Sequence, residues 1–239
     1  MSESPPPIRA VVFDLDDTLY DCLRQCVAPA HREAAKAMVE AGLKATPDEV
    51  LEARLALSGV HALDLDDAVA ATFRSVNPLR VAEAGRRAFY ERDPGPLEPY
   101  PFARDVVAKT RSVAKAVLLS TGHPATQRKK IEALGLASAF DEILLDDVFD
   151  VSMKPSKEDA LSTWLSRSGF APGEVLVVGD RPDSEIAAAL RLGMRALRIR
   201  GGELASRATP PGVPEADDVR AILAWLGAPP ETTGQAGAS

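Results

Sequence analysis

The sequence has few cysteines and contains no long hydrophobic run. Cys22 and Cys26 cannot build a disulfide framework, so we expect a reducing, cytoplasmic compartment. No stretch approaches the roughly 18 apolar residues of a membrane-spanning helix, so no membrane partner is expected. The start of the chain is proline-rich and has no apolar stretch before Ile8, which is unlike a secretory signal.

Basic residues are fewer than acidic ones. The chain has 28 Lys and Arg against 35 Asp and Glu, a formal net charge of −7, which argues against a nucleic-acid partner. An anionic small substrate remains compatible with this balance because a local site can oppose the global charge.

Apolar residues make up 46% of the 239, so the body should fold, and disorder is expected only at the ends, 1–7 and 228–239. The sequence leaves open whether the chain is a monomer or a homodimer.

Short aliphatic runs indicate buried strands, because continuous apolar runs are typical of strands that are covered on both faces. They alternate with helical segments after about residue 100, which is the pattern of a parallel α/β sheet. We therefore predict a Rossmann-like parallel sheet, with the last strand (within 195–200) on the outside and solvated on one face. The predicted strands are 9–14, 114–120, 142–145, 175–179 and 196–199, and a final helix is predicted over 216–226.

Residues 21–97 break this alternation. They are rich in Ala, Leu, Glu and Arg and have no strong strand signal. We predict an all-helical cap domain over 21–97, inserted into an α/β core domain that comprises 8–20 and 98–227. The predicted cap helices are 22–42, 47–57, 64–75 and 78–92.

The first predicted strand ends in Asp14-Leu15-Asp16-Asp17-Thr18, where Asp14 and Asp16 are two carboxylates at positions i and i+2. Ligands bind beyond the carboxyl ends of strands in an open parallel sheet. Two carboxylates about 4 Å apart repel by roughly 4 kcal/mol at an effective dielectric of 20, so a cation should compensate or one group should hold a proton. Either state suits an ionised nucleophile beside a proton carrier. The alternative is an acidic turn that caps the next helix.

Three further polar groups follow later strands. Ser120-Thr121-Gly122 offers a hydroxyl and backbone N–H groups to an anion, although an ordinary strand-to-helix turn explains it equally well. Lys154-Pro155 could aim a cation inward, whereas a lone lysine is usually solvated. Gly179-Asp180 could supply a carboxylate to Mg²⁺, or it is another polar loop. Their order and placement at strand ends predict one shared site.

These residues resemble the motifs of the haloacid dehalogenase superfamily. Asp14 to Leu19 looks like its first motif, Ser120 matches the second, Lys154-Pro155 the third and Gly179-Asp180 the fourth, over residues 8–226. The second motif departs from the Thr-Asn-Gly of many relatives. The fourth often has another Asp five residues later, where this chain has Glu185, so either Asp183 or Glu185 could support the metal.

The resemblance implies a Mg²⁺-dependent phosphatase that acts on a small phosphorylated metabolite. In that scheme Asp14 is the nucleophile and Asp16 the acid and base, while Ser120, Thr121 and Gly122 bind the phosphoryl group together with Lys154. The metal would be held by the Asp14 carboxylate, the Asp16 main-chain carbonyl and Asp180. Dehalogenating relatives lack a carboxylate at the position of Asp16, so its presence favours phosphoryl chemistry.

Two other functions stay open. A phosphomutase or phosphotransferase acting on a sugar phosphate uses the same carboxylate pair, and a catalytically silent relative would only bind. A response-regulator receiver disagrees with the helical insertion. Cap-side candidates for substrate contact are Tyr20, Cys22, Arg24 and Cys26, and His123 lies beside the anion-binding turn; each is equally explained by packing or by surface exposure.

Overall fold

The computed structural model describes residues 5–57, 64–147, 156–202 and 204–227. The chain divides into two compact units: one is formed by the chain up to Asp21 and from Glu98 onward, and the other is Cys22–Leu97. The tail predicted over 228–239 and most of the one predicted over 1–7 lie outside the described residues.

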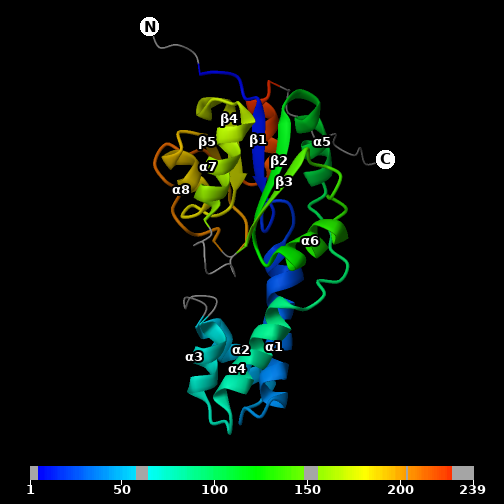
Figure 1. Ribbon diagram of the computed structural model, residues 1–239, viewed down its shortest axis with the longest axis vertical. Helices are drawn as coiled ribbons and strands as arrows, with labels where there is room; N and C mark the ends of the chain where they lie inside the picture. The colour runs from blue at the N-terminus through cyan, green and yellow to red at the C-terminus, as the bar shows by residue number, and fades with distance from the viewer. Residues whose placement is uncertain (1–4, 58–63, 148–155, 203, 228–239) are drawn as a thin grey trace, which may run out of the picture. The chain divides into compact units, whose positions relative to one another are not determined.

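The first unit contains a six-stranded, fully parallel sheet, which confirms the predicted α/β fold class. Its strand order is β3-β2-β1-β4-β5-β6, so β1 lies between β2 and β4 (Figure 1). All five predicted runs are strands. The bounds are β1 Ala10–Asp14, β2 Lys115–Gly122, β3 Glu142–Asp147, β4 Val175–Gly179, β5 Arg195–Ile199 and β6 Glu215–Ala216.

Helices cover the sheet by burying apolar side chains against it. Trp164 of α7 and Ile186 of α8 belong to one buried cluster with Val12, Val117 and Val177 of the strands, which places both helices over the same face (Figure 1). Alternation along β1 directs Phe13 to the other face, where its ring meets Phe140 edge-on. The helices of this unit are α5 Ala103–Val113, α6 Pro124–Ala133, α7 Lys157–Ser168, α8 Glu185–Arg191 and α9 Ile222–Trp225, with 3₁₀ turns η2 Pro172–Glu174 and η3 Val219–Ala221.

Two predictions near the C-terminal end are wrong. The helix predicted over 216–226 is instead the end of β6, then η3, and only then α9, because the Asp218 side chain accepts from the N–H of Arg220 and starts the helical turn there. The strand within 195–200 is not outermost, since β6 pairs beyond it. Arg198 is fully buried and donates to the carbonyls of Asp180 and Arg207, so its guanidinium satisfies backbone groups that water would otherwise solvate.

In the second unit, the regular elements of the described residues are all helices, beside one isolated antiparallel bridge between Leu43 and Ser75. The range predicted as one helix over 22–42 begins with a π-helix, η1 Leu23–Val27, which continues into α1 Ala28–Glu40. The remaining helices are α2 Pro47–Ala56, α3 Leu65–Thr72 and α4 Pro78–Tyr90. Thr46 and Glu49 form a capping box at the start of α2, which fixes where that helix begins.

A buried ion pair lies within this helical unit. Arg54 donates to Asp66, and both side chains are at most 2% exposed. A Cβ at position 85 would overlap Asp66, so the Gly85 backbone of α4 makes the room that the pair needs. The Arg54 Nε also donates to Nδ1 of His31 at 3.3 Å. Throughout the described residues, no helix has the length and apolar character required to cross a membrane.

Candidate active site

The strand order brings three polar positions to one edge of the sheet. Asp14 is the last residue of β1, Ser120 lies near the end of the adjacent β2, and Asp180 directly follows β4 on the other side. Asp14 and Leu119 are paired in register, so Ser120 lies one step further along the neighbouring strand. The carboxyl ends of the three central strands therefore form the floor of one site.

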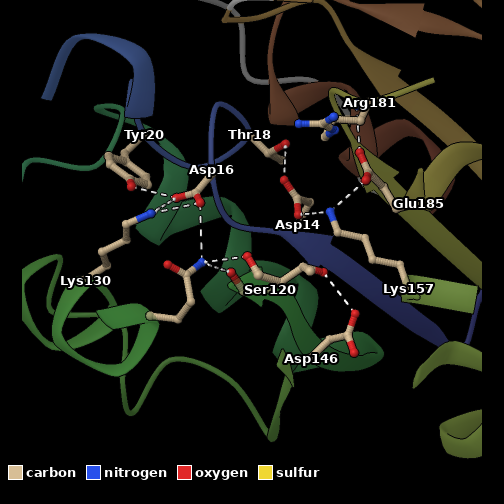
Figure 2. A network of polar contacts seen from close by, with 12 residues as sticks. Asp14, Asp16, Thr18, Tyr20, Ser120, Lys130, Asp146, Lys157, Arg181 and Glu185 are labelled. Carbon is tan, nitrogen blue, oxygen red and sulfur yellow. Dashed lines mark hydrogen bonds and ion pairs between the residues drawn. The ribbon is translucent and has the colours of Figure 1, made fainter. Parts of the chain in front are cut away.

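The Asp14 carboxylate is buried and receives two hydrogen bonds. Its side chain accepts from Lys157 Nζ at 2.5 Å and from Thr18 Oγ1 at 3.4 Å (Figure 2). Asp17 has a φ of 56°, a left-handed conformation that Asp tolerates, within the turn between Asp14 and Thr18. Burial raises the pKa of Asp14 to about 7, with the Lys157 ammonium opposing that rise and the Glu185 carboxylate adding to it.

Lys157 joins Asp14 to a second buried carboxylate. Its ammonium also donates to Glu185 Oε2 at 2.7 Å, and the other oxygen of Glu185 accepts from the N–H of Arg181 at 2.7 Å. Burial opposes the charged form of Lys157, but the two carboxylates outweigh it and raise its pKa. Any Cβ at position 179 would overlap the Glu185 side chain, so Gly179 is required for this carboxylate to fold over the end of β4.

Three carboxylates converge here, and two of them, Asp14 and Glu185, share the Lys157 ammonium. Ligand oxygens of Asp14, Asp180 and Glu185 all lie within 4.8 Å of one another, and all three residues are buried. Burial, together with the neighbouring carboxylates of Asp14 and Glu185, raises the pKa of Asp180 to about 8, and the Lys157 ammonium opposes that rise. The excess of negative charge and the hard oxygen donors fit a divalent cation such as Mg²⁺. Asp183 is not in this cluster, because its side chain pairs with Arg207 at the surface.

The Asp16 side chain belongs to a separate group of contacts (Figure 2). Lys130 Nζ lies 2.9 Å from Oδ2 and 3.1 Å from Oδ1 of Asp16. The Tyr20 hydroxyl donates to Oδ1 at 2.6 Å, and Gln127 Nε2 donates to Oδ2 at 3.3 Å. Both oxygens of this carboxylate are therefore held by donors from the same unit.

Gln127 connects Asp16 to Ser120. The buried Nε2 of Gln127 donates to Ser120 Oγ and lies 3.4 Å from the carbonyl of Thr121. A peptide carbonyl can only accept, so the amide nitrogen must face this side, and Ser120 Oγ accepts from it. The hydroxyl proton of Ser120 then stays available for another acceptor, which is the arrangement an anionic oxygen requires.

The remaining predicted residues are placed as follows. Thr121 continues β2 and its Oγ1 donates to Asp146 Oδ2 at 3.4 Å, while Gly122 ends the strand. Lys154 lies outside the described residues, and Lys157, three residues later, makes the contact with Asp14 that was expected of Lys154. Cys22 and Cys26 are buried free thiols within the helical unit.

Sequence reasoning missed three side chains that touch this site. Gln127 and Lys130 are three residues apart on α6, so they share a helix face, and the helix begins just after Ser120-Thr121-Gly122. That spacing was the sequence signal that could have indicated that both side chains face the site. Lys157 is the first residue of α7, after the N-cap Ser156, and only its place one turn beyond Lys154-Pro155 hinted at a role.

Known proteins resemble this chain along most of its length. A model of haloacid dehalogenase-like hydrolases matches residues 8–193. A glyceraldehyde 3-phosphate phosphatase of Methanocaldococcus jannaschii is 30% identical over 204 residues, covering 82% of this chain and 86% of the relative. A phosphoserine phosphatase of Thermus thermophilus is 30% identical over 229 residues, covering 82% and 90%.

Solved structures share the fold. A HAD-hydrolase of Bacillus subtilis bound to magnesium superposes with a TM-score of 0.66 at 15% sequence identity, covering 92% of this chain and 99% of that one. CbbY of Rhodobacter sphaeroides, solved in complex with phosphate, has a TM-score of 0.63 at 18% identity and the same coverage. The chain belongs to the haloacid dehalogenase-like hydrolase family.

Proposed function

We propose that this protein is a Mg²⁺-dependent phosphatase that hydrolyses a small phosphorylated metabolite through a phosphorylated Asp14. The observation that carries the proposal is the convergence of Asp14, Lys157, Asp180 and Glu185 at one buried strand edge. The Asp16 and Ser120 side chains, joined by Gln127, supply the proton carrier and the anion donor beside it. The curated phosphatase relatives support the choice of reaction class.

The reaction divides into two displacements at phosphorus. In the first, an oxygen of Asp14 forms a bond to phosphorus while the ester P–O bond breaks, and Asp16 gives its proton to the departing oxygen. In the second, Asp16 takes a proton from water as the water oxygen attacks phosphorus, and the bond to Asp14 breaks. The products are an alcohol and phosphate, and both carboxylates return to their initial states.

The other side chains stabilise charge. Ser120 would donate its hydroxyl proton to a phosphoryl oxygen, because its acceptor position is already filled by Gln127. Lys157, already hydrogen-bonded to Asp14, would offset the charge of the phosphoryl group. Mg²⁺ would be held by Asp14 and Asp180, with Glu185 beside them, and when bound it neutralises charge on the phosphoryl oxygens. Lys154 stays a candidate for the same cationic role.

The names of the phosphatase relatives suggest a class of substrate. They are named for glyceraldehyde 3-phosphate, phosphoserine and, in a mouse protein 26% identical to this chain, an N-acylneuraminate 9-phosphate. All three names describe a phosphate ester of an alkyl alcohol on a small polar molecule. We therefore propose an alkyl monophosphate ester as substrate.

A phosphate-release screen with Mg²⁺ tests the proposal. The panel should include glyceraldehyde 3-phosphate, phosphoserine, sugar phosphates and nucleotides, each with and without an added acceptor sugar. Asp14→Asn should release no phosphate, and Asp105→Asn, an exposed carboxylate on α5, should match the wild type. Activity of Asp14→Asn near that of the wild type would contradict the proposal. Turnover that needs the acceptor sugar would indicate a transferase instead.

A further inference from the structure

We infer that Lys130 is the positioning residue of the acid and base Asp16, an inference that rests on the proposed function. The contact joins residues 114 positions apart, between the last turn of α6 and the loop after β1. Lys130 reaches both oxygens of Asp16, at 2.9 and 3.1 Å, and its side chain is only 12% exposed. An ordinary lysine at a helix C-terminus extends into water.

The neighbouring contacts show what Lys130 restricts. The Tyr20 hydroxyl holds Oδ1 of Asp16 and the Gln127 amide holds Oδ2, so the plane of the carboxylate is defined from three directions. Asp14, two residues earlier, is held by Thr18 and Lys157 instead. The two carboxylates therefore keep different partners, and each has its own orientation.

Lys130 has a consequence for proton transfer. When Asp16 gives its proton to the departing oxygen, a carboxylate is formed next to the Lys130 ammonium. That interaction is stronger after transfer than before, so it lowers the barrier of the step in which the proton moves. The benefit is large when the departing group is a poor one, such as an alkoxide, and small for an aryl group that departs without protonation.

The dependence on the departing group separates this role from a structural one. An ion pair that only stabilises the fold would change turnover of every substrate by the same factor. A positioning role for the acid predicts that Lys130→Met slows the phosphorylation step of an alkyl phosphate by about 10²-fold, within the usual contribution of a general acid. The same variant should slow p-nitrophenyl phosphate much less.

The experiment compares single-turnover rates of phosphorylation with phosphoserine, or the best alkyl phosphate of the screen, and with p-nitrophenyl phosphate. Lys130→Arg keeps a cation that can donate to both oxygens of a carboxylate and should restore most of the alkyl activity. The matched control is Lys129→Met, at an exposed neighbouring lysine of the same helix, which should leave both rates unchanged. Circular dichroism verifies the fold of each variant.

If Lys130→Met loses the same factor in rate on both substrates, or loses none, the inference is overturned. The phosphatase proposal stays intact in that case as long as the wild type is active. A wild type inactive on every ester would remove both. If Lys130→Met does not fold, Tyr20→Phe provides the test, because it removes one donor to the same carboxylate. It should lower the alkyl rate relative to the aryl rate, and an unchanged ratio would count against the inference.

Discussion

Lys157 and Asp14 are 143 residues apart in the sequence, yet the lysine ammonium lies 2.5 Å from Oδ1 of the aspartate. Both side chains are at most 7% exposed. The same ammonium is 2.7 Å from Glu185, so one cation serves two buried carboxylates. The stability of the site and its proposed chemistry therefore depend on the same contact.

Lys157→Met should lower both stability and turnover. Breaking a buried ion pair by removing one partner typically costs about 3–5 kcal/mol, because the remaining carboxylates stay buried without their counter-charge. Urea unfolding without Mg²⁺ measures this loss, and Lys157→Arg should recover part of it. A free energy of unfolding equal to that of the wild type would show that the contact between Lys157 and Asp14 contributes little.

Mg²⁺ should raise the thermal unfolding midpoint of the wild type in a concentration-dependent way. A ligand at a hundred times its dissociation constant stabilises the folded state by about 2.7 kcal/mol. Asp180→Asn should abolish most of this rise, since it removes a buried oxygen donor from the cluster. The matched control is Asp183→Asn, whose side chain pairs with Arg207 outside the cluster. An equal rise in both variants would argue against the assigned metal site.

Gln127→Glu should weaken phosphate binding. The substitution places a carboxylate against Asp16 and the Thr121 carbonyl, and the Ser120 hydroxyl would then donate to it instead of to a phosphoryl oxygen. Loss of one hydrogen bond to a charged group, about 1.5 kcal/mol, raises the inhibition constant of inorganic phosphate by about tenfold. Gln127→Met leaves the hydroxyl proton free and should bind phosphate more tightly than the Glu variant. Equal inhibition of Gln127→Glu and the wild type would disprove this orientation of Ser120.

His31 should make the protein less stable in acid. Burial, with help from the Arg54 guanidinium, lowers the pKa of His31 from 6.5 to about 4. Below pH 6.5 His31 binds a proton in the unfolded chain but stays neutral in the folded chain. The free energy of unfolding therefore falls between pH 6.5 and 4, by about 1–3 kcal/mol. Above pH 6.5 both states are neutral and the effect disappears.

His31→Asn isolates this contribution, because Asn offers an acceptor near the position of Nδ1 and does not titrate. The difference in unfolding free energy between wild type and variant, measured in urea at several pH values, should shrink as the pH falls from 6.5 to 4. Burial raises the pKa of Asp66, although Arg54 opposes that rise. Because Asp66 titrates in both proteins, its contribution cancels in this difference. A difference that stays constant with pH would contradict the lowered pKa.

The strands and the site edge could be predicted because they depend on local patterns. Each of the five aliphatic runs is a strand, and the carboxyl ends of parallel strands lie on one edge, which is why Asp14, Ser120 and Asp180 were expected together. The residues expected to carry the chemistry lie next to strand ends in the sequence. Thr121 and Gly122 were expected in a turn but continue β2, since strand ends have no sharp sequence signal.

Contacts made across the fold could not be predicted. Whether Gln127 and Lys130 face the site depends on how α6 is rotated over β2 and β3, which spacing alone does not fix. Arg198 looked like a solvated residue in an alternating strand, but the chain from Leu204 to Thr209 returns over it and supplies carbonyl and hydroxyl acceptors. A buried polar side chain of this kind is recognised only when its distant partners are in place.

Trapping the phosphorylated residue tests the central claim most directly. Enzyme quenched in acid during turnover should be reduced with borohydride, which converts an aspartyl phosphate into homoserine, and the peptide that contains the first motif should be sequenced by mass spectrometry. The account predicts homoserine at position 14, dependent on substrate and absent from unreacted enzyme. Rapid phosphate release with an unmodified Asp14, or homoserine at another aspartate, would contradict it.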